Sequence, residues 1–190
     1  NVNFTKGSLL NEIGEFSFSD TKVNKVILPD SVAIIKQYAF SFNKHLKTVV
    51  FNGEIIENDA FLNSGITSFS LSNNTKFIGS NAFQYCKCLS QFDIDINNSN
   101  LSEIGEYAFS DTSLIEFNIP SSIKTIKRFT FNGCSYLKKI SISDNSNLEN
   151  IEEYSFAGDL SLELINIPKS IINISPSAFI NTPSLISIMI

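Results

Sequence analysis

The sequence predicts a right-handed, β-rich solenoid with one main parallel sheet, and three observations support this. A small residue followed by Phe recurs eight times, at spacings of 21 to 26 residues. An isoleucine lies five positions before each of these Phe residues, and an aliphatic residue follows each Phe after five or six positions. Internal periods of about 20–50 residues are typical of solenoids, in which every repeat packs on its neighbours.

The repeat is defined by three columns of residues. The small–Phe pairs are Ser17-Phe18, Ala39-Phe40, Ala60-Phe61, Ala82-Phe83, Ala108-Phe109, Thr130-Phe131, Ser155-Phe156 and Ala178-Phe179. The preceding isoleucines are Ile13, Ile35, Ile56, Ile78, Ile104, Ile126, Ile151 and Ile174. The aliphatic residues five or six positions after Phe are Val23, Leu46, Ile66, Leu89, Leu114, Leu137, Leu162 and Leu185.

Each repeat divides into a strand and a turn. Two further apolar positions, such as Phe92 and Ile94, alternate with polar ones, which predicts a strand with one buried face. The isoleucine, the small residue and Phe lie at i, i+4 and i+5, which predicts a single helical or 3₁₀ turn. An apolar residue three positions before the isoleucine, such as Leu101, predicts a second short extended segment on the opposite side of the coil.

The repeat resembles the BspA-like class of leucine-rich repeats. The clearest matches run from Leu101 to Ile119 and from Ile78 to Ile94, and the resemblance covers the whole chain. It implies a β-rich leucine-rich-repeat solenoid. It also implies a surface or secreted protein of bacteria or parasitic protists, of the kind implicated in adhesion to host matrix proteins and host cells. The family's Cys position holds Cys only at Cys86 and Cys134, and we interpret it as structural.

We expect residues 1–190 to form a single leucine-rich-repeat solenoid domain of about eight repeats. Composition does not change abruptly along the chain. Val2 and Phe4 fit the end of an earlier strand, and neither end carries a polar capping repeat. We therefore expect these residues to come from a longer array.

Composition excludes two classes of partner. The net charge is −5, which argues against nucleic acid and against an anionic membrane surface, because both require a basic face. The stretch from Ser170 to Ile190 lacks charge, but it contains Pro176 and Pro183 and obeys the repeat, so we do not expect it to span a membrane.

No catalytic, metal or cofactor site is predicted. The only histidine, His45, lies in a turn with no nucleophile motif near it, and no phosphate-binding glycine loop is present. We therefore expect no enzyme, no cofactor and no small-molecule substrate. Cys86 and Cys134 lie two repeats apart, roughly 10 Å for strands spaced by about 4.8 Å, which is too far for a disulfide. We therefore expect buried free thiols. Cys86 and Cys88 could form half of a metal site, but no second cluster completes it.

The candidate partner-binding site lies on the strand face that points away from the core. Its residues form a polar, acidic patch across neighbouring strands: Gln91, Asp93, Asp95, Glu116, Asn118 and Lys139. Curved solenoids use such faces as extended binding sites. Two alternatives are a merely solvated sheet face and a calcium site formed by Asp93, Asp95 and Glu116.

Three functions remain open. The first is a segment of an extracellular or cell-surface adhesin whose sheet face binds a host or neighbouring-cell protein. The second is a structural spacer in a longer surface array. The third is an intracellular scaffold for protein interactions.

Overall fold

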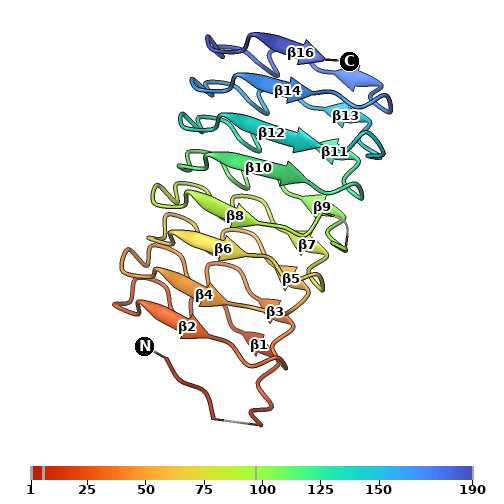
Figure 1. Cartoon of the computed structure of the whole chain (residues 1–190). Coiled ribbons are helices and arrows are strands. Elements are labelled where there is room, and N and C mark those ends of the chain that lie inside the picture. Colours follow the sequence, from red (N-terminus) through yellow and green to blue (C-terminus); the bar gives the residue numbers. More distant parts are fainter. Residues whose placement is uncertain (1, 6, 97, 190) are drawn as a thin grey trace.

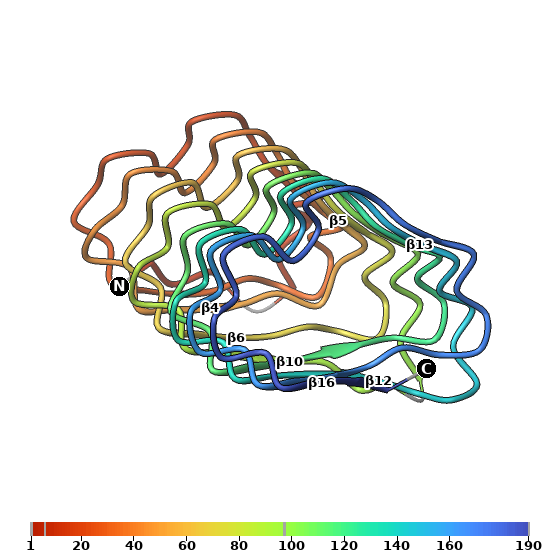
Figure 2. The ribbon, with the colours of Figure 1, turned by 90° about the horizontal axis from the view of Figure 1, so that it is seen from above.

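The computed structural model describes residues 2–5, 7–96 and 98–189, which form a stack of coils whose strands pair in parallel (Figure 1). The longer strands are β2 (Lys25–Ile27), β4 (Thr48–Val50), β6 (Ser68–Ser70), β8 (Gln91–Asp93), β10 (Glu116–Ile119), β12 (Lys139–Ile142), β14 (Leu164–Asn166) and β16 (Ser187–Met189). The shorter ones are β1 (Glu12–Ile13), β3 (Ile34–Ile35), β5 (Ile55–Ile56), β7 (Phe77–Ile78), β9 (Glu103–Ile104), β11 (Thr125–Ile126), β13 (Asn150–Ile151) and β15 (Asn173–Ile174). Seen along the stack, successive coils follow similar outlines that shift progressively (Figure 2).

The register of the longer strands confirms the predicted columns. Phe69 is the partner of Phe92, and Phe117 is the partner of Ile140, so equivalent repeat positions face each other. In each of the longer strands from β2 to β14 the second residue is buried. The residues on either side of it face away from the core, as strand geometry requires. Val2 also forms a bridge to Val26, which confirms its place beside β2.

The ladder of longer strands is interrupted twice, where the sequence predicted one continuous sheet. The hydrogen-bonded groups are β2-β4, β6-β8 and β10-β12-β14-β16. Each interruption falls where a coil has lost a residue relative to the coil before it. One residue fewer separates Phe61 from Ile66 than separates Phe40 from Leu46. The same deficit recurs at Phe109, whose coil contains β10.

The predicted helical turn is not confirmed: within the described residues this segment forms hydrogen-bonded turns and no helix. Asn81 and Tyr85, two positions either side of Phe83, have φ angles of 57° and 59°. A left-handed residue on each side of Phe prevents the continuous right-handed run that a helix needs. The same pair flanks the other Phe residues: Phe16 and Asp20, Tyr38 and Phe42, Asp59 and Asn63, Tyr107 and Asp111, Phe129 and Gly133, Tyr154 and Gly158, Ser177 and Asn181.

The second extended segment occurs, but later in the repeat than predicted. The shorter strands end at the isoleucine column itself, as β9 does at Ile104, and Leu101 lies buried before the strand begins. Within the described residues the pairing of these strands is parallel, in the groups β1-β3-β5-β7-β9 and β11-β13-β15.

Phe and the small residue before it connect neighbouring coils. The Phe61 N–H donates to the Ala82 carbonyl at 2.8 Å, and the Phe83 N–H donates to the Ala108 carbonyl at 2.8 Å. These alanines are fully buried. A small side chain is needed here because a larger one would separate two backbones that are hydrogen-bonded across the coil interface.

The Phe rings form a continuous stack through the core. The centroid of Phe83 lies 5.0 Å from that of Phe61 and 5.4 Å from that of Phe109, with nearly parallel planes. Phe92 meets Phe83 edge-on at 5.3 Å. Each such pair contributes about 0.5–1.5 kcal/mol beyond the burial of its area. The stack continues into the last coil, where the Phe179 ring lies 5.2 Å from that of Phe156, although Ile174 of that coil is 39% exposed and its column is otherwise buried.

A column of small polar groups lies three positions after Phe. It consists of Thr21, Asn43, Ser64, Cys86, Thr112, Cys134, Asp159 and Thr182. The Cys86 thiol donates to the Phe61 carbonyl at 3.0 Å, and the Cys134 thiol donates to the Phe109 carbonyl at 3.1 Å. Cys86 and Cys134 are free and buried, as predicted, whereas Cys88 is free and exposed.

Asp159 is the one carboxylic acid of this column. Its carboxylate is fully buried, and Oδ1 accepts a hydrogen bond from the Cys134 N–H at 2.8 Å. Oδ2 has no hydrogen-bond partner among the described residues. Burial raises the pKa of this carboxyl well above its ordinary value of 3.8.

Truncation of the ring stack should destabilise the fold strongly. We expect Phe83→Ala to lower the free energy of unfolding by about 3–5 kcal/mol, because it removes a buried ring and leaves a cavity. Chemical denaturation checks this, with Phe42→Ala as the control, since the Phe42 side chain is 44% exposed. A Phe83→Ala loss below about 1 kcal/mol would contradict the packing described above.

Asp159 should make stability depend on pH. The raised folded-state pKa means that the folded protein favours the protonated carboxyl. The free energy of unfolding is therefore highest below pH 3.8 with respect to this group, and it falls as the pH rises from there through the folded-state pKa. Asp159→Asn keeps an oxygen acceptor for Cys134 and cannot ionise. We expect the stability of the variant relative to the parent to increase with pH, in denaturation curves measured across a pH series. If the stabilities of the parent and the variant changed with pH in the same way, the raised pKa of Asp159 would be refuted.

The three thiols should differ in reactivity. Burial raises the pKa of Cys86 to about 11 and raises the pKa of Cys134 further, and the reactive species is the thiolate. Mass spectrometry after treatment with iodoacetamide should show one modification in the native protein, at Cys88, and three after unfolding. Cys88→Ser should abolish the native reaction, and native labelling of Cys86 or Cys134 would contradict their burial.

Candidate functional site

Five of the six predicted site residues lie on strands. Gln91 and Asp93 belong to β8, Glu116 and Asn118 to β10, and Lys139 to β12. Phe92 and Phe117, the residues between them, point into the core, so the polar side chains face outward. Strand alternation therefore explains why these positions are outward-facing and polar.

Asp95 does not share the strand position that the sequence predicted. β8 ends at Asp93, and Asp95 lies in the following turn, where its Oδ2 accepts a hydrogen bond from the Asn98 side chain at 2.8 Å. The strand ends early because β8 pairs with β6 only as far as Asp93.

A groove joins four of the predicted residues. It has a volume of about 260 Å³ and is lined by Ser90, Gln91, Phe92, Asp93, Ile115, Glu116 and Asn118. The groove lies at the second interruption of the ladder, where β8 pairs with β6 and β10 pairs with β12. Lys139 and Asp95 are not among its lining residues. We call this depression the β8–β10 groove.

The carboxylates of the groove have no cationic partner among the described residues. The Gln91 amide donates to both oxygens of Asp93 at 3.0 Å. Lys139 is the register partner of Glu116, but no ion pair or hydrogen bond joins the Glu116 side chain to another residue that the structure describes. The lining of the groove is therefore anionic, and its two carboxylates form no ion pair with a described residue.

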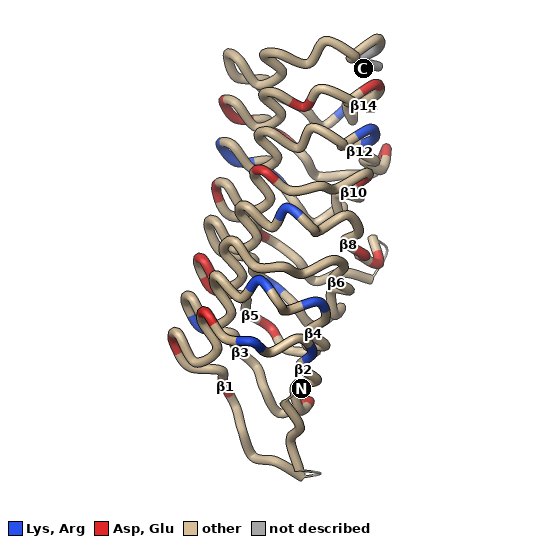
Figure 3. Tube along the Cα trace, turned by 90° about the vertical axis from the view of Figure 1, so that its left-hand side faces the viewer, with Lys and Arg blue, Asp and Glu red and all other residues tan. Residues whose placement is uncertain are grey.

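Five other carboxylates among the described residues form ion pairs with a cation of a neighbouring coil. Lys76 lies 2.7 Å from Glu54, Lys127 lies 2.6 Å from Glu103, and an Arg128–Glu153 pair is 2.8 Å apart. Acidic and basic residues are interspersed along the side shown in Figure 3. The β8–β10 groove differs from these ion-paired positions because its described lining contains two carboxylates and no Lys or Arg.

Sequence analysis missed Ile115 and Ser90 as part of the site. Ile115 is 49% exposed and lies just before β10, at the edge of the groove. The signal was the shorter spacing between Phe109 and Leu114, which changes how the chain enters the strand.

The described residues do not form the calcium site that was considered for Asp93, Asp95 and Glu116. Among the residues that the structure describes, no group of three or more His, Cys, Asp or Glu side chains could hold a metal ion. Asp95 does not line the groove that contains Asp93 and Glu116. His45 lies exposed in its turn.

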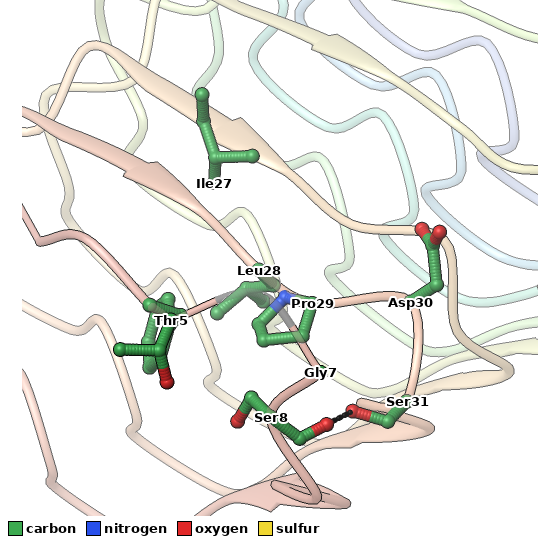
Figure 4. A pocket seen from close by; sticks show the side chains of 9 residues that line it. Thr5, Gly7, Ser8, Ile27, Leu28, Pro29, Asp30 and Ser31 are labelled. Atoms are coloured by element: carbon green, nitrogen blue, oxygen red, sulfur yellow. Dashed lines mark hydrogen bonds between the residues drawn. The ribbon is translucent and has the colours of Figure 1, made fainter.

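Two further depressions have other surroundings. One of about 370 Å³ lies between the N-terminal segment and the exit of β2, with Ile27 and Pro29 in its wall (Figure 4). The Ser31 hydroxyl hydrogen-bonds there to the Ser8 carbonyl at 3.0 Å. Another, of about 320 Å³, is lined by Glu106, Arg128, Glu152, Glu153 and Ser175; Arg128 forms an ion pair with Glu153, and Glu106 and Glu152 leave this lining acidic as well.

The uncharged stretch from Ser170 to Ile190 contains strands β15 and β16 as far as it is described. Over residues 2–5, 7–96 and 98–189, the chain has no helix with the length and apolarity needed to cross a bilayer.

Comparison with solved structures shows the same fold. A leucine-rich repeat protein from Eubacterium ventriosum has a TM-score of 0.73 at 24% identity, over 86% of this chain and 44% of its own. The pneumococcal vaccine antigen PcpA has a TM-score of 0.60 at 24% identity, over 97% and 55%. A leucine rich cell surface protein from Faecalibacterium prausnitzii has a TM-score of 0.51 at 22% identity, over 96% and 64%. The chain thus spans less than two thirds of each of these three proteins.

The search of curated proteins found no match. A family model described as the BspA type leucine rich repeat region matches in six copies, over residues 1–90 and 54–186. Together with the stacked Ile and Phe columns and the parallel strands, this match shows that the chain belongs to the BspA-type leucine-rich-repeat family.

Proposed function

We propose that the chain is a non-catalytic protein-binding segment of a cell-surface or secreted protein, and that it contributes to adhesion to host or neighbouring-cell proteins. The observation that carries the proposal is the outward strand face with the β8–β10 groove, whose two carboxylates form no ion pair with a residue that the structure describes. A parallel-strand solenoid presents such a face as a rigid, extended surface.

Two comparisons support the location of this activity. One similar solved structure is described as a cell surface protein, and another as a vaccine antigen of pneumococcus. Both are larger than this chain, so binding regions outside it would add to the interaction. Within the chain, we assign the binding surface to Gln91, Asp93, Glu116 and Asn118, with Asp95 and Lys139 at its edges.

Binding should depend on the charge of the groove. The purified chain would be tested on host cells and immobilised extracellular matrix proteins, beside the double variant Asp93→Lys/Glu116→Lys. We expect saturable binding by the parent. In the variant, binding should weaken at least about tenfold, because the two lysines would repel a partner surface whose positive charge complements the acidic groove.

Glu163→Lys/Asp144→Lys is the matched control, since both residues are exposed and lie outside the groove lining. It should bind as the parent does. Equal binding by the parent and the groove variant would place the interaction elsewhere on the coil. If the folded parent bound none of these cells or proteins, the result would favour the alternative function, a structural spacer in a longer surface array.

A further inference from the structure

We propose that the β8–β10 groove receives an arginine side chain of the partner protein, with the guanidinium between Asp93 and Glu116 and the aliphatic stem against Ile115. This inference rests on the proposed function, because it names the group that the same site would recognise. The charge, the shape and the apolar edge of the groove together fit this one side chain.

The charge of the groove selects a cation. Asp93 and Glu116 come from different strands and line one depression that contains no Lys or Arg. Neither carboxylate makes an ion pair with a described residue, whereas five carboxylates elsewhere on the stack do. A concave site lined by one sign of charge raises the local concentration of the opposite sign, and it disfavours phosphate or an acidic peptide.

The polar lining suits a planar, multiply donating group. Besides the two carboxylates, the groove offers the side-chain amides of Gln91 and Asn118. A guanidinium has five N–H donors in a fixed plane and binds carboxylates in a bidentate manner. An ammonium is a compact point charge that is more strongly hydrated, so it gains less from acceptors spread over two strands.

The apolar edge of the groove fits the stem of the same side chain. Ile115 is half-exposed, whereas Ser90 and Lys138 occupy the equivalent position in the coils before and after it, as the hydrogen bonds from Ile115 N–H to Ser90 O and from Lys138 N–H to Ile115 O show. Arginine buries its methylene stem along apolar surface while its charged end remains hydrogen-bonded. An exposed isoleucine beside two unpaired carboxylates matches both halves of that side chain.

A fragment titration tests the assignment without knowledge of the partner. The 190-residue chain would be titrated with n-butylguanidinium, n-butylammonium and neutral n-butylurea, and amide shifts followed by NMR. We expect saturable shifts at Gln91, Asp93, Ile115 and Glu116 with butylguanidinium, weaker ones with butylammonium, and none with butylurea. Equal responses to the two cations, equal responses to butylurea, or shifts centred elsewhere would each overturn the proposal.

Conservative variants identify the groups that bind. Asp93→Asn and Glu116→Gln should each weaken butylguanidinium binding by about threefold or more, the scale of one exposed charge pair. Ile115→Ser should weaken butylguanidinium binding and leave that of guanidinium ion alone unchanged. Glu163→Gln is the control for loss of one exposed carboxylate and should have no effect.

The two proposals fail in different ways. If cell or matrix binding is lost in the lysine double variant but the fragment does not bind the groove, the protein-binding function stands and the arginine assignment falls. If the fragment binds as expected but no protein surface is bound, the chemistry of the groove stands and the proposed adhesive function falls.

Discussion

The hydrogen bond from each Phe N–H to the small residue of the next coil is the interaction on which the rest of the structure depends. It fixes the distance between coils where the Phe rings stack, as at Phe83 and Phe109, whose centroids lie 5.4 Å apart. Because this contact recurs along the chain, each strand starts from a similar place and the predicted register follows. The buried thiols and hydroxyls then satisfy carbonyls that the turn leaves beside the core.

The candidate site arises where this regularity is broken. The coil of Phe109 has one residue fewer before its strand than the coil of Phe83, and the ladder between β8 and β10 is absent there. The stack nevertheless holds the two strands in the same layer, so a depression forms with side chains from both. A fully regular array would have presented a flatter face with paired strands. Loss of one residue in a turn thus affects a surface formed by two coils.

Sequence alone predicted the columns, the strand register and the outward position of Asp93 and Glu116, because a period of two and a repeated Ile–Phe spacing determine which side chains are buried. It could not distinguish a helical turn from one with left-handed residues, since both place Ile and Phe on the same side. Tyr85 gives no sign of its φ of 59°, unlike Asn or Gly at equivalent positions. The groove was also beyond sequence reasoning: the missing residue is visible, but its effect on hydrogen bonding between strands depends on the three-dimensional stack.

Native-state hydrogen exchange tests the central role of the coil-to-coil hydrogen bond most directly. If the Phe N–H groups hold the stack together, the amides of Phe61, Phe83 and Phe109 should exchange only through global unfolding, with free energies equal to that of the whole chain. Amides of the exposed turn residues should exchange much faster through local opening. Rapid exchange at these three Phe amides in a folded protein would contradict the account, because the coils would then be held together by side-chain packing without the backbone contact.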